Sequence, residues 1–301
     1  MGVVSLHILF MPNYLGTLTN KELKTGREIT NQEYNQLVQF SDRLRLFGNC
    51  QTLFKIFLFN FTDLFEYLNS ANAPLNMTIR TSQFDEIIFN INRHLSNTLA
   101  AFRAYVDHIP SQLNRRFGKD SPQRGAFDRK TSELFDTFFE YRFFTKFRNY
   151  TQHREYYKYY VEYKADLKSM KPESSKGFYY FSLDPQVLLN SYDSWGRCKQ
   201  DLKNMSSPID LKSEINKLAS IMTHLDMFVS NFYLDDLNET AEYFKRTFHV
   251  DDFLNFEYCI VLNFITEGKK HTANIKHLAT EVISTQLRKV KAYQQIENNR
   301  G

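Results

Sequence analysis

The chain has 301 residues, of which 42% are hydrophobic and 24% are charged, and its formal net charge is +4. These proportions are typical of a globular protein that buries a sizeable core. A charge this small over this length does not by itself indicate a nucleic-acid-binding protein, so any basic surface must be local. The three cysteines are widely spaced and form no C-x2-C pair. The cysteines therefore imply neither a disulfide framework nor a zinc site, and we expect a reducing, cytoplasmic location.

The apolar segments predict neither a signal peptide nor a membrane span. Residues 1–10 lack a basic lead and a small-residue cleavage site, and we expect a short strand or core segment there. The most apolar run, residues 53–65, contains Lys55, Asn60 and Asp63. It is shorter than the ~20 residues of a membrane helix, which predicts a buried helix segment and no membrane association. Glycine motifs for nucleotides and histidine spacings for metals are absent from the sequence, so no cofactor and no metal is predicted.

Large side chains and few backbone breaks predict long helices packed on aromatic seams, since the chain has 28 Phe and 18 Tyr against 10 Gly and 7 Pro. Thr30 followed by Glu33 is a capping box, and the hydrophobic residues after it follow alternating three- and four-residue steps. This pattern predicts one long or once-broken helix over about 31–70. The same periodicity predicts a second helix over about 84–109, which Pro110 ends.

The middle of the chain is expected to contain one more long helix and a short strand. Basic and turn-forming residues over 114–125 predict a mobile connection. A helix with a phenylalanine-rich side follows over about 127–168. Residues 171–177 break this pattern, and residues 178–182 predict a short strand.

We expect the last third of the chain to be mostly helical as well. A 4-3-4-3 hydrophobic spacing predicts a straight helix over 211–232, and another helix is expected over 237–249. Residues 257–265 form an apolar run that could be either strand or helix. A closing helix is expected over 274–295. The predicted fold class is therefore mainly α, with at most a few short strands.

Residues 147–154 combine an aromatic face with a polar patch. On an α-helix at about 100° per residue, Arg148, Gln152, Asn149 and His153 lie at about 0°, 40°, 100° and 140° around the axis. These four residues therefore form one contiguous polar surface. Arg148 and His153 lie at its two edges, so a single straight helix would not bring them onto one atom. Convergence needs a distortion of the helix or a second copy of the patch.

The spacing of Arg148, Asn149 and His153 on an aromatic-rich helix resembles the motif of HEPN domains. In that motif an arginine, usually followed by a polar residue, precedes a histidine by four to six residues. The resemblance implies a HEPN-like helical bundle in residues 1–170 and a helical C-terminal extension with minor strand content in residues 171–301. Many members of the family are metal-independent ribonucleases in which two motifs face each other across a homodimer axis.

The resemblance implies a role in RNA cleavage for each motif residue. Arg148 would hold the scissile phosphate and stabilise its developing charge. His153 would relay the proton during attack of the ribose 2′-hydroxyl on that phosphate. Asn149 would orient one of these two side chains. Glu140, about two turns before Arg148 on nearly the same side, and Gln152, inside the patch, are expected to support the site.

The motif has a competing copy and a competing interpretation. Arg103 and His108 have the same spacing, but Asn149 and the aromatic flanks favour the later copy. Alternatively, Arg148 and His153 are ordinary solvated residues on the polar face of a helix, or are paired with carboxylates.

A run of tyrosines and basic residues follows the motif directly. Arg154, Tyr156, Tyr157 and Lys158 could contact RNA, because aromatic rings stack on unpaired bases and cations bind the backbone. Tyrosines at this density also form packed or dimer-forming surfaces, with their hydroxyls in water. Both alternatives stay open at the level of the sequence.

The function that the resemblance implies is a metal-independent, homodimeric endoribonuclease, acting as a toxin or phage-defence effector. The main alternative is a non-catalytic HEPN-like module that binds RNA or a protein, and a third is a structural helical interaction protein. Some family toxins are silenced by a partner that modifies a tyrosine two residues after the histidine. Glu155 stands at that position here, so a cognate antitoxin or other regulatory protein would act in another way.

Overall fold

The computed structural model divides the chain into two compact units. The described residues are 12–19, 22–70, 72–74, 81–154, 156–157, 159–165, 176–250, 257–267, 270–280, 282–283 and 285. The first unit joins Met1–Asn49 to Val229–Gly301, and the second comprises Cys50–Phe228. This division differs from the boundary expected near residue 170, which falls inside the second unit. The strand or core segment expected at residues 1–10 lies outside the described residues.

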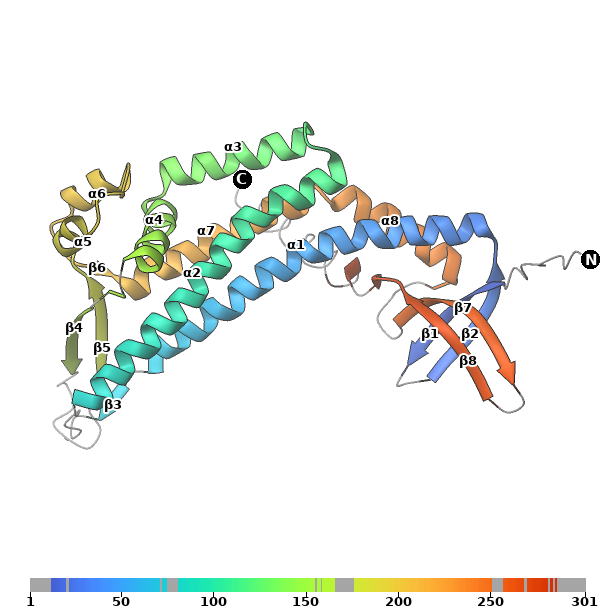
Figure 1. Ribbon diagram of the computed structural model, residues 1–301, viewed down its shortest axis with the longest axis horizontal. Helices are drawn as coiled ribbons and strands as arrows, with labels where there is room; N and C mark the ends of the chain where they lie inside the picture. The colour runs from blue at the N-terminus through green and yellow to red at the C-terminus, as the bar shows by residue number, and fades with distance from the viewer. Residues whose placement is uncertain are drawn as a thin grey trace, which may run out of the picture. The chain divides into compact units, whose positions relative to one another are not determined.

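Strands from both ends of the chain form one antiparallel sheet in the first unit, drawn in blue and red in Figure 1. The strands are β1 (Asn13–Thr19), β2 (Glu22–Ile29), β7 (Glu257–Glu267) and β8 (Lys270–His277). Their order is β2-β1-β7-β8. β1 pairs with β7, so that Tyr14 lies opposite Val261.

This sheet corrects one expectation and decides another. The strand alternative for residues 257–265 is confirmed by β7. The closing helix expected over 274–295 is wrong at its start, because Asn274 to His277 belong to β8 and pair with β7. Residues 286–295 lie outside the described residues. The helical pattern of residues 274–277 is local, and the hydrogen bonds that these residues form with β7 favour a strand instead.

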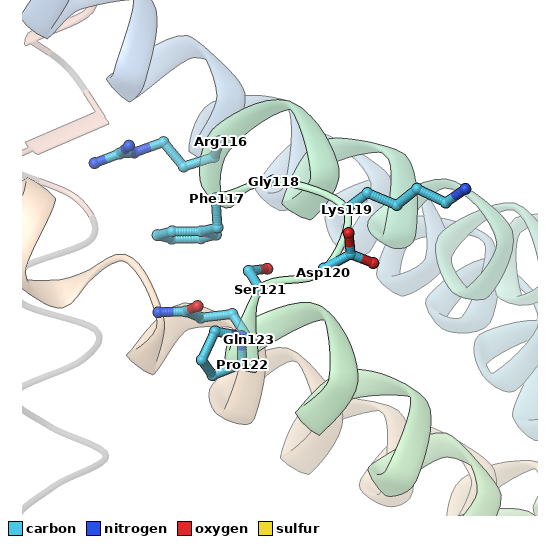
Figure 2. Close-up of a pocket in the computed structure, with 8 residues that line it drawn as sticks. All are labelled: Arg116, Phe117, Gly118, Lys119, Asp120, Ser121, Pro122 and Gln123. Atoms are coloured by element: carbon cyan, nitrogen blue, oxygen red, sulfur yellow. The ribbon is translucent and has the colours of Figure 1, made fainter.

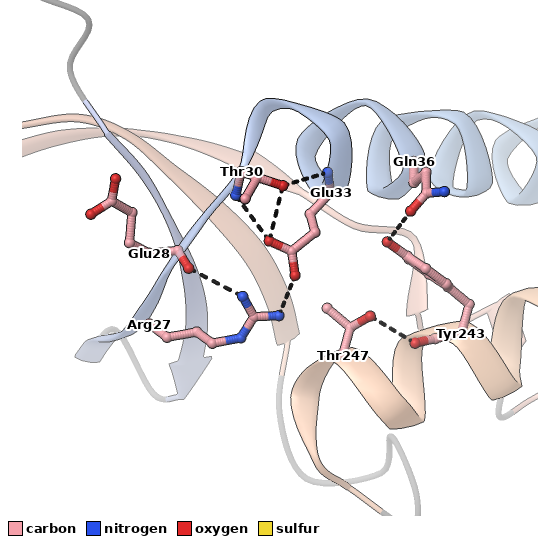
Figure 3. Close-up of polar contacts among 7 residues, drawn as sticks. All are labelled: Arg27, Glu28, Thr30, Glu33, Gln36, Tyr243 and Thr247. Atoms are coloured by element: carbon pink, nitrogen blue, oxygen red, sulfur yellow. Dashed lines mark hydrogen bonds and ion pairs between the residues drawn. The ribbon is translucent and has the colours of Figure 1, made fainter.

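The capping box at the start of α1 (Asn31–Ser70) is confirmed (Figure 3). The Thr30 amide donates to Glu33 Oε2 at 2.9 Å, and the Glu33 amide donates to Thr30 Oγ1 at 3.2 Å. Arg27 Nη2 donates to the other carboxylate oxygen of Glu33 at 2.6 Å. This hydrogen bond is the main reason why the pKa of Glu33 is lowered to about 2. The predicted helix over 31–70 is therefore present with the cap that its sequence indicates.

In the second unit, α1 packs along α2 (Thr81–Phe117). Thr98 Oγ1 donates to the Asn60 carbonyl at 2.9 Å, and the rings of Phe54 and Tyr105 meet edge to face with centroids 5.9 Å apart. Residue numbers rise from 54 to 60 along α1 while those of the partners fall from 105 to 98 along α2, so the two helices are antiparallel.

Pro110 lies inside α2, so the predicted end of this helix is wrong. Ile109 before the proline and Leu113 after it are both completely buried. Burial of these two side chains stabilises the helix by about 3–6 kcal/mol. This outweighs the cost of about 3 kcal/mol for a proline in a helix interior. Tertiary packing therefore keeps α2 helical on both sides of Pro110, a residue that would end an isolated helix.

The single helix expected over 127–168 is two helices followed by a strand. α3 (Pro122–Thr137) and α4 (Phe139–His153) meet at Phe138, whose backbone is extended. β4 (Tyr160–Ala165) then pairs antiparallel with β5 (Lys176–Leu183), which confirms the strand expected at 178–182. The helix prediction after His153 is wrong. Tyr157 and Tyr159 are buried while Tyr156 and Tyr160 are exposed, which fits the two-residue period of a strand.

The remaining elements are β3 (Asn72–Pro74), α5 (Pro185–Ser191), α6 (Cys198–Asn204), β6 (Ile209–Asp210), α7 (Leu211–Asn231) and α8 (Leu234–Phe248). They belong to the second unit, except α8 and the last residues of α7, which belong to the first. α7 and α8 confirm the helices expected over 211–232 and 237–249. Eight helices and a few short antiparallel strands make up the described residues, which confirms the predicted class. No described helix combines the length and the hydropathy that a membrane crossing requires.

Candidate functional site

α4 is an aromatic-faced helix held in place by the chain's only tryptophan. Phe143, Phe147 and Tyr150 are at most 1% exposed on its inner face. The Trp195 ring stacks on Phe143 and on Tyr150, with centroids 6.0 Å and 5.9 Å apart. Its indole nitrogen donates to the Leu188 carbonyl at 2.9 Å. The predicted aromatic side of the helix is therefore buried, and the opposite side carries the polar residues.

Arg142, in the first half of α4, is fully occupied by structural contacts. Its Nε and Nη2 atoms donate to the two carboxylate oxygens of Asp201 at 2.8 Å and 3.1 Å. Its Nη1 atom donates to the carbonyls of Phe135 and Asp136, at 2.5 Å and 3.1 Å. The bond to Asp201 raises the pKa of Arg142 further. The sequence did not indicate that Arg142 pairs with Asp201, because the two residues are far apart along the chain.

Arg148, in the second half of α4, is only partly satisfied. Its Nη1 atom donates to Asn149 Oδ1 at 3.3 Å. Its Nε atom is buried and has no hydrogen-bond partner, although most buried polar atoms have one. In the described part of the chain, no carboxylate forms an ion pair with Arg148. The structure therefore brings Arg148 and Asn149 together and leaves donors of the guanidinium uncommitted.

Gln152, His153 and Arg154 are exposed at the C-terminal end of α4. The helix is regular from Phe139 to His153, so the angular spacing of about 140° between Arg148 and His153 holds. The distortion that could have brought these two side chains together is absent from α4. Within one chain the four patch residues share a surface, but Arg148 and His153 do not meet.

Glu140 does not support Arg148. Its carboxylate lies 3.3 Å from Lys217 Nζ, and Lys217 also pairs with Glu214 at 2.7 Å. Burial raises the pKa of Glu214, and the neighbouring Glu140 adds to this effect. The role expected for Glu140 is therefore corrected: it joins the start of α4 to the start of α7.

The earlier copy of the motif has an arginine that is already paired. Arg103 Nη2 lies 2.7 Å from Asp107 Oδ1, and its Nε donates to Asp107 Oδ2 at 2.8 Å. His108 is exposed on the same helix. A guanidinium that a carboxylate already holds through both of its oxygens has less attraction left for a phosphate. This contrast favours the later copy, Arg148 to His153.

The tyrosine run after α4 is divided between buried and exposed rings. Tyr157 is 3% exposed, and its hydroxyl accepts a hydrogen bond from the Asp184 amide at 2.7 Å. Its predicted contact with RNA is therefore corrected to a packing role. Tyr156 is 63% exposed and remains available, as does the exposed Arg154. Lys158 lies outside the described residues.

A pocket lies at the turn between α2 and α3 and is separate from the α4 patch (Figure 2). Arg116 and Lys119, which line it, point away from each other in Figure 2 and do not converge on one point. Gly118 makes the turn with φ +98°. The basic connection expected over 114–125 is therefore shorter than predicted, with α2 ending at Phe117 and α3 beginning at Pro122.

No group of three or more His, Cys, Asp or Glu side chains among the described residues could hold a metal ion. No family model matches the chain, and the comparisons with curated proteins and with solved structures found no match either. The interpretation of the site therefore rests on the chemistry of α4 and on the segment that follows it.

Proposed function

We propose that this protein is a metal-independent endoribonuclease whose active site is assembled from the α4 patches of two identical chains. The observation that carries the proposal is the state of Arg148. Its Nε is buried without a partner, and its single recorded hydrogen bond is to the neutral Asn149 side chain. The buried Nε cannot reach a ligand, but Nη2 makes no hydrogen bond within the described residues. Together with Nη1 it forms a fork that matches two phosphate oxygens.

His153 supplies the proton transfers in this proposal. It is exposed, its imidazole ring can accept a proton on one nitrogen and then donate it, and it stands on the same surface as Arg148. One His153 takes the proton from the ribose 2′-hydroxyl as the 2′-oxygen attacks phosphorus. The same imidazole, now protonated, donates this proton to the 5′-oxygen as its bond to phosphorus breaks. The products are a 2′,3′-cyclic phosphate and a 5′-hydroxyl end.

Asn149 is a positioning residue in this scheme. Its side-chain oxygen accepts from Arg148 Nη1, which restricts the rotamers of a long and otherwise mobile side chain. The orientation leaves the remaining guanidinium donors directed at the substrate. Gln152 lies between Arg148 and His153 around the helix and adds a neutral donor to the same surface.

The regular geometry of α4 supports a site made by two chains. Arg148 and His153 lie about 140° apart around an undistorted helix, so one α4 cannot direct both at a single phosphate. A two-fold axis beside the patch would bring the Arg148 of each chain next to the His153 of the other. The HEPN-like interpretation of the motif has the same requirement.

The test is cleavage of a single-stranded RNA in EDTA by the wild type, Arg148→Ala and His153→Ala. We expect loss of at least about 100-fold in each variant, because charge stabilisation and proton transfer each contribute at this scale. Arg103→Ala and His108→Ala have the same spacing on α2 and serve as matched controls that should keep full activity. Absence of cleavage in the wild type, or full activity in both α4 variants, would sink the proposal.

Mixing the two inactive variants tests the composite site. In a heterodimer of Arg148→Ala and His153→Ala chains, one site receives Arg148 from one chain and His153 from the other. We expect the mixture to regain a measurable part of the wild-type activity, while each variant alone stays inactive. A mixture as inactive as its components would exclude a site that shares residues between chains in this way.

A non-catalytic module that binds RNA or a protein is the alternative that the same experiments detect. It predicts that Arg148→Ala weakens RNA binding although the wild type cleaves nothing. A toxin or phage-defence role and a cognate antitoxin belong to the nuclease proposal. They predict that expression of the wild type, and not of His153→Ala, stops cell growth.

A further inference from the structure

The tyrosines that follow α4 have two opposite environments. Tyr157 and Tyr159 are 3% and 8% exposed, whereas Tyr156 and Tyr160 are 63% and 62% exposed. Exposed rings that gather on one surface mark a binding site more often than rings that are scattered singly. The buried pair and the exposed pair therefore have different tasks.

The buried tyrosines fix the segment to three helices. The Tyr157 ring meets Phe147 of α4 edge to face at 6.2 Å, and its hydroxyl accepts from the Asp184 amide at the start of α5. The Tyr159 hydroxyl donates to Asn92 Oδ1 of α2 at 2.9 Å. Because Tyr157 and Tyr159 lie between Tyr156 and Tyr160 along the chain, these contacts hold the backbone of the exposed rings in place before any ligand binds.

β5 adds an exposed ring to the face of the sheet that carries Tyr160. Tyr160 lies opposite Ser182, and Glu162 lies opposite Tyr180, which is 41% exposed. Tyr160 and Tyr180 are therefore diagonal neighbours on one face, about 7–8 Å apart at their backbones. Figure 1 shows β4 and β5 side by side. The opposite face is buried at Phe181, which is 4% exposed.

We propose that this face of β4 and β5 binds unpaired RNA by stacking bases on Tyr160 and Tyr180, with Tyr156 as a further ring. The inference rests on the proposed function, since it names the single-stranded substrate that the α4 site would cleave. Each ring can take a base of its own, whereas bases inside a duplex present no free face to a flat platform.

Charge favours RNA as the occupant of this face. Arg154 and His153 are exposed immediately before the rings, and Arg148 carries uncommitted donors. The phosphate backbone is therefore directed to the basic end of α4 and the bases to the tyrosines. This arrangement leads a single strand from the platform to the cleavage site.

The test measures binding of a fluorescein-labelled single-stranded RNA of about 12 nucleotides. His153→Ala protein is used in EDTA, so that the probe stays intact. We expect Tyr160→Ala and Tyr180→Ala each to weaken binding about tenfold, and Tyr160→Phe and Tyr180→Phe to bind as before, because phenylalanine keeps the stacking face. Phe89→Ala removes an equally exposed ring, 65% exposed on α2, and should leave binding unchanged.

Several results would overturn the stacking surface. These are no measurable RNA binding, unchanged affinity in both alanine variants, an equal loss in the phenylalanine variants, or an equally strong effect on an RNA duplex. Unchanged RNA affinity together with loss of the dimer in a mass measurement would assign the face to self-association instead.

The stacking surface and the nuclease can fail separately. If the wild type cleaves no RNA but Tyr160→Ala weakens binding, the surface stands and the nuclease fails. If cleavage depends on Arg148 and His153 while both tyrosine variants bind normally, the nuclease stands and the surface fails.

Discussion

Two arginines on α4 show how context divides one residue type between structure and chemistry. Arg142 makes four hydrogen bonds, two to the Asp201 carboxylate and two to carbonyls at the end of α3. Arg148, six residues later, has one bond to a neutral amide and a buried Nε without a partner. A fully matched guanidinium holds helices together. A guanidinium with few hydrogen bonds keeps N–H donors from which a phosphate can accept.

The two halves of α4 also differ in how they contact the rest of the chain. The first half is tied to its neighbours by charge, through Asp201 and through the Glu140 contact with Lys217. In the second half, the aromatic rings of the buried face pack together, and the polar side chains lie on the opposite face of the helix. Substitutions in the first half should therefore change stability, and substitutions in the exposed patch should change activity alone.

The largest expected effect tests the packing that both halves share. Trp195→Ala removes the ring between Phe143 and Tyr150 and should lower the free energy of unfolding by about 4 kcal/mol. Urea denaturation followed by circular dichroism measures this loss. Trp195→Phe keeps an aromatic ring and should lose clearly less. A loss below about 1 kcal/mol for the alanine variant would mean that α4 does not depend on this contact.

The second prediction concerns the matched arginine. Arg142→Ala leaves the partly buried Asp201 carboxylate without its partner and should cost about 3 kcal/mol. The loss of Trp195 fluorescence in urea reports the unfolding midpoint. Arg103→Ala breaks an exposed pair with Asp107 and should cost under about 0.5 kcal/mol. Equal losses in the two variants would contradict the structural role assigned to Arg142.

The third prediction is that the free energy of unfolding depends on pH through Glu214, which lies in the first turn of α7. Burial raises the pKa of Glu214 above 4.5, while Lys217, which is half exposed, keeps its charge. The folded protein then holds the Glu214 proton to a higher pH than the unfolded chain does. Its contribution to stability is therefore present below pH 4.5 and declines as pH rises through the raised pKa.

Glu214→Gln removes this titration. The variant should lose less stability than the wild type between pH 4.5 and neutral pH, and urea midpoints across that range measure the difference. Glu242→Gln, which changes an exposed carboxylate on α8, is a control that should follow the wild type. The same pH slope in Glu214→Gln and the wild type would refute the assignment.

The smallest expected effect on stability belongs to the undermatched arginine. Arg148→Met keeps the aliphatic length and removes the buried Nε, so the free energy of unfolding should change by less than about 0.5 kcal/mol. The same variant should lose RNA cleavage in EDTA. A large loss of stability would show that Arg148 is a structural residue like Arg142.

The candidate site was predictable to the extent that its residues are close in sequence. Arg148, Asn149 and His153 lie within two turns of one helix, so their spacing and shared polar surface follow from helical periodicity. Asp201 could not be assigned to Arg142, because no local pattern links positions so far apart. The division of the tyrosines also escaped prediction, since it depends on Asn92 and on Asp184.

The sequence by itself determined the elements whose causes are local. The Thr30 and Glu33 cap, the α7 periodicity and the mainly α class all depend on residues a few positions apart, and each is present in the structure. Only the tertiary structure decided the course of α2 through Pro110, the end of α4 and the pairing of β1 with β7. Burial and strand pairing join segments distant in sequence, and their free energy exceeds the local preferences that they override.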